Sequence, residues 1–464
     1  MENSMKKQIV SAIMLATVIA FVAFDKKATA ADCFPDPCDS VCPAPCDPTC
    51  EKDSFCKYLT EKSVFESRLF ENSLIGRKSK SRIYFTGWVL TGITANNHGS
   101  TNSYGPGLSG YGYNNRLNSA GTGVVRNGYN DQSGNSCLLM TEHPADWKVN
   151  QLWFSARRDL TNTFDWGFQA DFAYGTDARY ARNWSDRSFD YKWGSGDYFA
   201  AFTQLYGTLG TKDLYVKVGK FGGGFNHETM AAPREFFYSH ANLCFGGPLT
   251  ASGVAVEWKP AQRWSFTTGW LAGTFNSLEN PYNDSGFLGK ATYHVSKDTS
   301  LSYNIFYNDR GARPRHIIGT HNGVVECHHM VILRWKLSPR WFYMGEVGYM
   351  ENKVHPYVGN ALSAHSFGVN NHLIYTVNKK LSAGLRGEYH YSYGSTFDNR
   401  AVTGGQGGDL WEFTLAANYK INPKTTFRPE IRYDYVDYNN DYRPFCAGKK
   451  NDQLSGGVSF LVMF

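Results

Sequence analysis

The residues with the most evident chemistry lie near the N-terminus, where six of the ten cysteines fall between positions 33 and 56. Interleaved prolines exclude a regular helix or a central strand there. In an exported protein, an even cluster predicts disulfide bonds, either within the chain or to other envelope proteins. Zinc binding is the alternative, although the usual C-x2-C pairs are missing. The six cysteines are Cys33, Cys38, Cys42, Cys46, Cys50 and Cys56.

A second group that could bind a metal is Cys327-His328-His329, with His321 nearby. Neighbouring residues of a strand point to opposite faces, so the two adjacent histidines could not readily share an ion. The Gly219 to Gly224 stretch lacks the order of a phosphate-binding loop. No local signature marks a nucleophile held by a base. We therefore expect no catalytic residue, no metal site and no cofactor.

Charged residues elsewhere follow a different pattern, because they alternate with apolar ones. Positions between them carry residues such as Val331, Leu333, Trp411 and Phe413. A Lys or Arg facing lipid at mid-membrane costs about 2–4 kcal/mol, so this segregation is expected of strands with one lipid face and one lumen face. The predicted lumen residues are Arg157, Asp165, Asp171, Lys217, Glu257, Arg334, Lys336, Glu346, Arg386, Glu388, Glu412, Lys420, Arg428, Glu430, Arg432 and Asp434.

The elements that must position these charges are long β-strands. From Phe164 to Tyr174 the aromatic residues all fall on one parity and the polar ones on the other. A tilted strand that crosses a bilayer needs about 9–11 residues, whereas an ordinary strand has about 5–6. The pattern predicts sixteen strands near 82–93, 149–159, 164–174, 197–208, 213–221, 250–259, 263–273, 287–295, 299–307, 325–337, 341–350, 363–377, 381–391, 409–420, 425–436 and 451–464.

The connections between these segments alternate in length. Seven are short and carry turn residues, such as Asn378-Lys-Lys380. Eight are long and rich in Gly, Asn, Ser and Tyr, near 94–148, 175–196, 222–249, 274–286, 308–324, 351–362, 392–408 and 437–450. This arithmetic predicts a closed, even-stranded, antiparallel up-and-down barrel whose two ends lie on one side of a membrane.

Composition is compatible with such a barrel. A mean hydropathy of −0.42 would ordinarily favour a soluble protein, but the polar lumen of a barrel lowers the average. Aromatic residues make up 16% of the chain, which fits girdles at both membrane interfaces. The net charge of +6 is dispersed over both signs, so we expect no nucleic-acid partner.

The N-terminal 80 residues lie outside the predicted barrel. Residues 1–30 read as a secretion signal, with Lys6-Lys7, an apolar run from Ile9 to Phe24 and a small-residue site ending at Ala30. An uncleaved anchor is the alternative, although a spanning helix needs about 20 apolar residues. We expect residues 31–80 to form a Cys- and Pro-rich periplasmic segment and linker, and residues 81–464 the barrel.

Five stretches stand out by their order and spacing: Trp166-Gly-Phe-Gln-Ala-Asp171, Tyr174-Gly-Thr-Asp-Ala-Arg179, Val216-Lys-Val-Gly-Lys-Phe221, Ala231-Ala-Pro-Arg-Glu-Phe-Phe-Tyr-Ser-His240 and Ser252-Gly-Val254. Together they resemble the OmpL-like outer-membrane β-barrel porins of the porin-2 type. The Gly222 to Gly224 run departs from this resemblance, which leads us to expect bulkier residues there. The last strand ends on Phe464 and resembles the terminal signature of outer-membrane barrels.

The resemblance to sixteen-stranded porins implies that the third long connection, from Gly222 to Leu249, folds into the barrel and narrows it. Its charged residues would then form the constriction. The candidates are His227, Glu228, Arg234 and Glu235. An extracellular loop held down by Phe236, Phe237 and Tyr238 is the alternative.

The expected function is a passive, water-filled channel for small hydrophilic solutes and ions in the outer membrane of a Gram-negative-type bacterium. Eight positive and eight negative lumen residues predict weak ion selectivity. The expected partners are membrane lipid and the permeating solutes, with further copies of the chain or other envelope proteins, linked through the cysteines, as additional candidates. Two alternatives stay open, namely an envelope protein cross-linked through those cysteines and a barrel enzyme.

Overall fold

We describe a computed structural model of the chain. The described residues are 82–98, 140–141, 145–182, 189–190, 192–195, 197–222, 224–245, 247–274, 278–280, 283–310, 321–356, 362–393, 408–438, 445 and 450–464. The N-terminal cysteine cluster and the predicted secretion signal lie outside them. No helix among these residues has the length and apolar character needed to cross a membrane.

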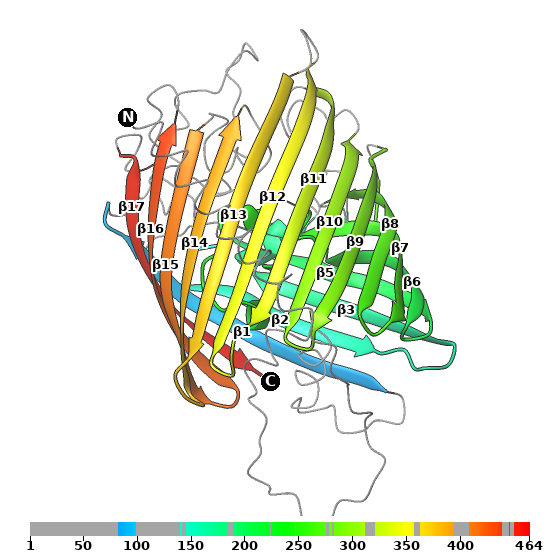
Figure 1. Cartoon of the computed structure of the whole chain (residues 1–464), viewed down its shortest axis with the longest axis horizontal. Coiled ribbons are helices and arrows are strands. Elements are labelled where there is room, and N and C mark those ends of the chain that lie inside the picture. Colours follow the sequence, from blue (N-terminus) through cyan, green and yellow to red (C-terminus); the bar gives the residue numbers. More distant parts are fainter. Residues whose placement is uncertain are drawn as a thin grey trace, which may run out of the picture. The chain divides into compact units, whose positions relative to one another are not determined.

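Sixteen long antiparallel strands form one closed barrel (Figure 1), which confirms the predicted fold class. A short strand, β4, pairs only at the edge of β5. The bounds are β1 Ile83–Asn96, β2 Lys148–Arg158, β3 Asp165–Gly175, β4 Gly194–Ser195, β5 Tyr198–Gly210, β6 Leu214–Gly222, β7 Thr250–Ala261, β8 Trp264–Thr274, β9 Ser285–Ser296, β10 Thr299–Arg310, β11 His321–Lys336, β12 Trp341–Pro356, β13 Leu362–Thr376, β14 Leu381–Tyr393, β15 Gly408–Asn422, β16 Thr425–Tyr438 and β17 Asp452–Met463.

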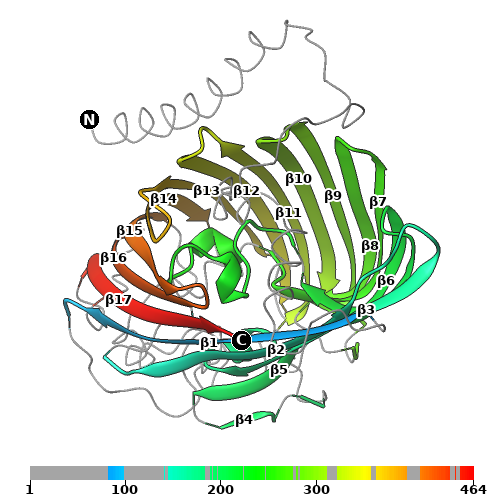
Figure 2. The same ribbon diagram turned by 90° about the horizontal axis from the view of Figure 1, so that it is seen from below.

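The barrel closes where the first strand meets the last. β1 pairs with β2 on one side and with β17 on the other, Trp88 opposite Met463 (Figure 2). Phe464 extends this seam, since its N–H donates to the Gly87 carbonyl at 2.9 Å and its own carbonyl accepts from the Gly87 N–H at 3.1 Å. The start of β1 and the end of β17 therefore both lie at the end of the barrel that carries the short turns.

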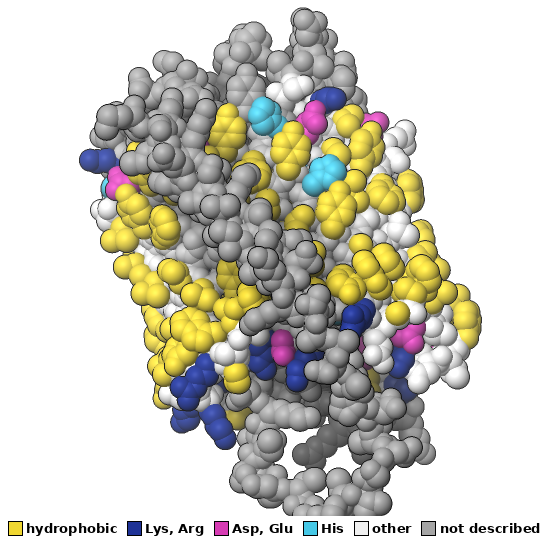
Figure 3. All heavy atoms as spheres, in the orientation of Figure 1, with side chains coloured by type: hydrophobic (Ala, Val, Ile, Leu, Met, Phe, Trp, Pro, Cys, Tyr) yellow, Lys and Arg dark blue, Asp and Glu magenta, His cyan; other side chains and the backbone are white. Residues whose placement is uncertain are grey.

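Alternation along the strands separates an apolar outer face from a polar inner face. In β15, Phe413 and Leu415 are 55% and 56% exposed, whereas Glu412 and Thr414, which alternate with them, are fully buried. Figure 3 shows apolar side chains across the outer surface, with Lys and Arg gathered towards the turn end. The exposed face suits lipid, because its large exposed side chains are apolar or aromatic along most of the strands.

Cross-strand aromatic pairs support this outer face near the turns. The rings of Trp341 and Tyr375 lie 4.5 Å apart and those of Trp264 and Tyr293 lie 4.6 Å apart. Such pairs contribute roughly 0.5–1.5 kcal/mol beyond the area they bury. They occupy the depth at which aromatic residues are usual in membrane barrels.

The structure differs from the sequence prediction mainly at the long loops. β12 continues to Pro356 rather than stopping near 350, and β11 begins at His321 rather than near 325. Val354 pairs with Val324 and Lys353 with Val325, so this hairpin continues beyond the alternating segment. Outside a membrane both strand faces are wet, and the residues there no longer need to alternate. The predicted 351–362 loop is accordingly reduced to residues 357–361.

Candidate functional site

The connection between β6 and β7, residues 223–249, lies inside the ring of strands (Figure 2). We call it loop 3, since it is the third of the long connections. It contains two short 3-10 helices, η3 Ala232–Arg234 and η4 Asn242–Phe245. Four of its aromatic residues are at least 95% buried, namely Phe225, Phe236, Phe237 and Tyr238. Loop 3 is therefore packed against the barrel wall along much of its length.

Glycines on the inner face of the wall make room for loop 3. A Cβ atom built at Gly384 would lie 2.3 Å from the Phe236 ring, and one at Gly368 would lie 2.7 Å from Leu243. Real Cβ atoms essentially never come so close to another heavy atom. The missing side chains thus form sockets for two apolar residues of the loop, and any larger residue at these positions would push the loop away.

Carboxylates of the wall accept hydrogen bonds from backbone amides of loop 3. An irregular segment leaves its N–H groups without strand or helix partners, and buried N–H groups need acceptors. Glu346 of β12 accepts from the His227 amide at 2.7 Å. Glu430 of β16 accepts from Tyr238 at 2.9 Å and Ser239 at 3.2 Å, and Glu388 of β14 accepts from Asn242 at 2.8 Å and Leu243 at 2.6 Å.

Arginines of the wall bind the carbonyl groups of the same segment. Arg386 of β14 donates to the Ser239 carbonyl at 2.7 Å, and Arg432 of β16 donates to the His240 carbonyl at 2.7 Å. Arg428 donates at 3.2 Å to the carbonyls of Ala232 and of Glu235. The guanidinium fork suits this task, because it offers several donors in fixed directions.

The opposite wall holds loop 3 through neutral side chains. Gln151 of β2 donates to the Met230 carbonyl at 2.7 Å and accepts from the Ala232 amide at 3.2 Å. Asn150 accepts from the Tyr238 hydroxyl at 2.9 Å. Asn150 and Gln151 are both buried although they are adjacent, because the register between β1 and β2 shifts between Leu90 and Thr91. Loop 3 is thus bonded to both sides of the barrel.

Glu228 is the charged centre of the loop. His240 Nδ1 lies 3.1 Å from its carboxylate, while His372 Nε2 and Arg386 Nη1 each lie 3.2 Å from it. Arg386 also contacts Glu412 at 3.0 Å. Burial alone would raise the pKa of Glu228, but the Arg386 charge and the two imidazoles hold that pKa well below its ordinary value. Glu228 should therefore be ionised at neutral pH in the folded loop.

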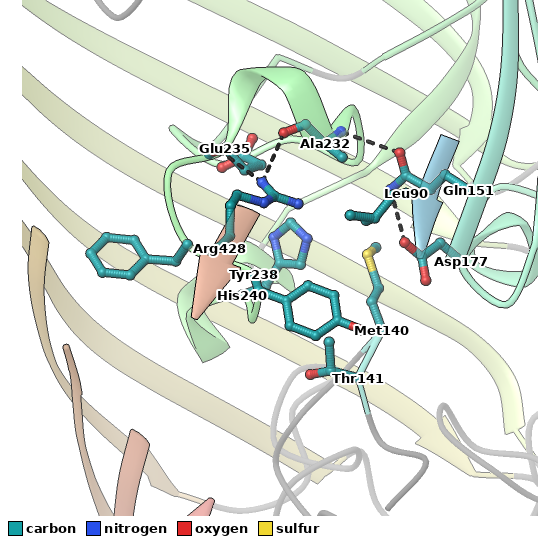
Figure 4. A pocket seen from close by; sticks show the side chains of 11 residues that line it. Leu90, Met140, Thr141, Gln151, Asp177, Ala232, Glu235, Tyr238, His240 and Arg428 are labelled. Atoms are coloured by element: carbon teal, nitrogen blue, oxygen red, sulfur yellow. Dashed lines mark hydrogen bonds between the residues drawn. The ribbon is translucent and has the colours of Figure 1, made fainter. Parts of the chain in front are cut away.

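A small cleft remains between loop 3 and strands β1, β2 and β16 (Figure 4). It contains a carboxyl on each side, because Asp177 faces it from η2 (Asp177–Tyr180) and Glu235 from the loop. Burial raises the pKa of Asp177 to about 6. Its lining is Leu90, Met140, Thr141, Gln151, Asp177, Ala232, Glu235, Phe237, Tyr238, His240 and Arg428.

Glu235 makes the packing of loop 3 depend on pH. Burial, and after it the charge of Glu228, raises its pKa from 4.5 to about 7, although His240 and the bonds from Thr229 oppose the shift. A carboxyl with a raised pKa favours folding while it is protonated. Its contribution is fully present below pH 4.5 and is lost as the pH rises to about 7. The loop should accordingly be held more firmly in mild acid than at about pH 8.

We predict that Glu235→Gln removes this pH dependence. The glutamine oxygen can still accept from the Thr229 amide, which lies 2.6 Å from Glu235 Oε1. The variant loop should be more protected than the wild type at about pH 8, by at most about 3 kcal/mol, and similar to it near pH 5. Hydrogen exchange of residues 226–244 measures this difference. An equal pH dependence in both proteins would contradict the assignment.

The structure brings the four predicted constriction residues together on loop 3. Glu228 and Glu235 are buried, whereas His227 and Arg234 are half-buried. His227 Nδ1 accepts a hydrogen bond from Arg334 Nε at 3.1 Å. His227, Glu228 and Glu235 are therefore each held by a hydrogen bond or an ion pair within the barrel.

The sixteen predicted lumen residues all lie on the face opposite the exposed apolar side chains. Seven of them contact loop 3, namely Arg334, Glu346, Arg386, Glu388, Arg428, Glu430 and Arg432. Nine are buried: Arg157, Asp171, Glu346, Arg386, Glu388, Glu412, Arg428, Arg432 and Asp434. Seven are half-buried: Asp165, Lys217, Glu257, Arg334, Lys336, Lys420 and Glu430.

The sequence prediction missed residues that hold the loop without carrying a permanent charge. Gln151, Asn150 and His372 are the main ones. Parity of the predicted β13 would have placed His372 on the inner face. The two adjacent polar residues of β2 gave no such signal, because strict alternation assigns one of them to lipid.

The Cys327-His328-His329 group behaves as strand geometry predicts. His328 is buried and its Nε2 atom lies 3.1 Å from Asn352 Oδ1, whereas His329 bonds to the Tyr303 hydroxyl at 2.8 Å on the exposed face. The two imidazoles therefore point to opposite faces and could not bind one ion.

A closed barrel with an apolar exterior, a polar interior and an inserted loop defines the porin class of outer-membrane β-barrels. A family model described as "Putative beta-barrel porin-2, OmpL-like" matches residues 82–464, and the chain belongs to this family. This confirms the resemblance seen in the sequence. Family and fold together place the protein in the bacterial outer membrane as a channel-type barrel.

Solved structures agree on the fold. The outer membrane channel DcaP of Acinetobacter baumannii is similar at 12% identity and a TM-score of 0.53, over 84% of this chain and 100% of that one. OmpT of Vibrio cholerae, described as outer-membrane expressed, is similar at 10% identity and a TM-score of 0.50, over 84% of this chain and 99% of that one. No curated protein matches the sequence. At such identities the likeness concerns the fold alone.

Proposed function

We propose that the protein is a passive diffusion channel for small hydrophilic solutes and ions, narrowed by loop 3. The observation that supports this most directly is the position of loop 3 inside a closed barrel, bonded to the wall on both sides. A sixteen-stranded barrel has a lumen too wide to be filled by its own side chains. A fixed loop would reduce that lumen to the dimensions of small solutes, and no chemical step is required.

The charges that remain accessible suggest a weak preference for anions. All eight acidic lumen residues have partners or are buried: for example, Asp165 contacts Arg82 at 2.6 Å and Arg158 at 3.0 Å, and Glu257 pairs with Lys217. Among the lumen charges, four basic residues are half-buried, namely Lys217, Arg334, Lys336 and Lys420, against three acidic ones, namely Asp165, Glu257 and Glu430. Equal numbers of charges in the sequence thus leave a small positive excess along the path of an ion.

Single-channel recording in a planar bilayer tests this function. Under a salt gradient we expect a reversal potential shifted modestly towards the anion value, and Lys336→Glu or Arg234→Glu should move it towards the cation value. Lys379→Glu is the matched control, because Lys379 is exposed in the turn between β13 and β14. Absence of any channel from folded protein would contradict the proposal, as would lipid or peptide hydrolysis by the pure barrel.

The remaining expectations concern the ends of the chain. We propose that residues 1–30 are removed on secretion and that residues 31–80 lie in the periplasm. The start of β1 at the turn end supports this, because short turns face the periplasm in outer-membrane barrels. Assembly with further copies of the chain stays a prediction, as does cross-linking through the N-terminal cysteines.

A further inference from the structure

Three side chains of loop 3 that can bind a metal converge at one point. Glu228, His240 and Cys244 are all buried, and one ligand atom of each lies within 4.8 Å of the others. His240 Nδ1 lies 3.1 Å from Glu228 Oε2 and 3.8 Å from Cys244 Sγ. His240 Nδ1 therefore lies next to both the Glu228 oxygen and the Cys244 sulfur.

These separations agree with a tetrahedral zinc ion. Zinc bonds of about 2.0–2.1 Å to nitrogen or oxygen and about 2.3 Å to sulfur imply ligand separations of about 3.3 Å between oxygen and nitrogen and about 3.5 Å between nitrogen and sulfur. The observed 3.1 Å and 3.8 Å differ from these by a few tenths of an ångström. Rotation of the side chains within their wells covers such a difference.

A second imidazole approaches the same carboxylate from the wall. His372 of β13 is 3% exposed, and its Nε2 atom lies 3.2 Å from Glu228 Oε1. His372 and Arg386 therefore both face Oε1, and Oε2 is left to face His240.

We propose that Glu228, His240 and Cys244 bind one zinc ion. A thiolate, an imidazole and a carboxylate form a donor set that favours zinc over hard cations such as magnesium or calcium. The Cys244 thiol would lose its proton to solvent as the sulfur binds. The ion would bind while loop 3 folds into the barrel, since the finished site is buried.

Arg386 is the group that could compete with such an ion. Its Nη1 atom lies 3.2 Å from Glu228 Oε1, whereas His240 contacts the other oxygen, Oε2. The ion can therefore use Oε2 while Arg386 keeps its contact with Oε1. Glu412, which lies 3.0 Å from Arg386 Nε, balances the guanidinium charge. The ionised thiol adds the further negative charge that a divalent ion needs.

Such an ion would close a ring within loop 3. Residues 228, 240 and 244 all belong to the loop. The metal would therefore fix the fold of the loop itself, which hydrogen bonds to the wall do only indirectly. This inference does not depend on the channel function, because it is tested by metal content.

The test uses the full chain, extracted from outer membranes without chelator. Zinc per chain is measured by mass spectrometry in the wild type, in Cys244→Ser and in His240→Asn. We expect each variant to contain about one zinc fewer than the wild type, whatever the N-terminal cysteines bind. Cys327→Ser is the matched control, since Cys327 is the other free cysteine among the described residues, and it should retain the wild-type content.

Cobalt gives a second readout that does not rely on metal surviving purification. Protein refolded with Co²⁺ should show a thiolate-to-cobalt charge-transfer band that Cys244→Ser abolishes and Cys327→Ser preserves. Heat-modifiable migration on gels verifies that each variant has folded. Zinc contents equal in wild type and Cys244→Ser, together with a cobalt band that this substitution leaves unchanged, would overturn the proposal.

Discussion

Replacing Thr229 to Tyr238 by a Gly-Gly linker is expected to raise the single-channel conductance roughly twofold or more. The removed segment contains η3 and three of the buried aromatic residues, Phe236, Phe237 and Tyr238. Its loss would open the centre of the lumen and expose the wall charges that now bind it, among them Arg428. Recording in a planar bilayer measures the change.

A second variant separates the volume of the segment from its contacts. Replacing the same residues by a Gly/Ser sequence of equal length keeps the loop length but removes the aromatic packing. Its conductance should fall between those of the wild type and the deletion, with more current noise, since the loop could then move. A folded deletion variant with unchanged conductance would show that loop 3 does not limit the channel.

Arg386→Met is expected to release loop 3 by a single substitution. Arg386 is fully buried and contacts the Ser239 carbonyl, Glu228 and Glu412. Removing one partner of a buried ion pair leaves the others uncompensated and costs about 3–5 kcal/mol. Because the strands pair with one another without loop 3, this loss should appear as loop opening rather than unfolding of the barrel. Hydrogen exchange of residues 226–244 should accelerate strongly, and the channel should flicker.

Two controls accompany this substitution. Lys379→Met removes a positive charge from an exposed turn and should leave both measurements unchanged. Arg386→Lys keeps the charge but loses the planar fork, so an intermediate effect is expected. If exchange in the loop stayed at its wild-type rate in Arg386→Met, the ion-pair cluster would not be what fastens the loop.

Most of the fold could be predicted from the alternation of polar and apolar residues along the strands. The run from Phe164 to Tyr174 can satisfy one wet and one apolar face only as a strand, and fifteen further segments share that property. Once short and long connections alternate between sixteen strands, a closed ring follows, because an open edge cannot lie in lipid. The prediction failed where this constraint ends, as in the extension of β12 to Pro356.

The site was less accessible to such reasoning, because its contacts join distant parts of the chain. The Asn242 amide donates to Glu388, and no local sequence pattern predicts this pairing. Parity assigns the wall charges to the inner face, yet it does not distinguish a charge that faces water from one that binds a loop. The bulge that turns both Asn150 and Gln151 inward also breaks the rule on which the assignment rests.

Loop 3 has a mechanical consequence as well. It is bonded to β2 through Gln151 and, across the lumen, to β14 and β16 through Glu388 and Glu430. If only the hydrogen bonds between neighbouring strands held a wide barrel, its cross-section could flatten under lateral pressure from the surrounding lipid. A strut that joins opposite walls resists that flattening, so the cross-section of the barrel is braced from within.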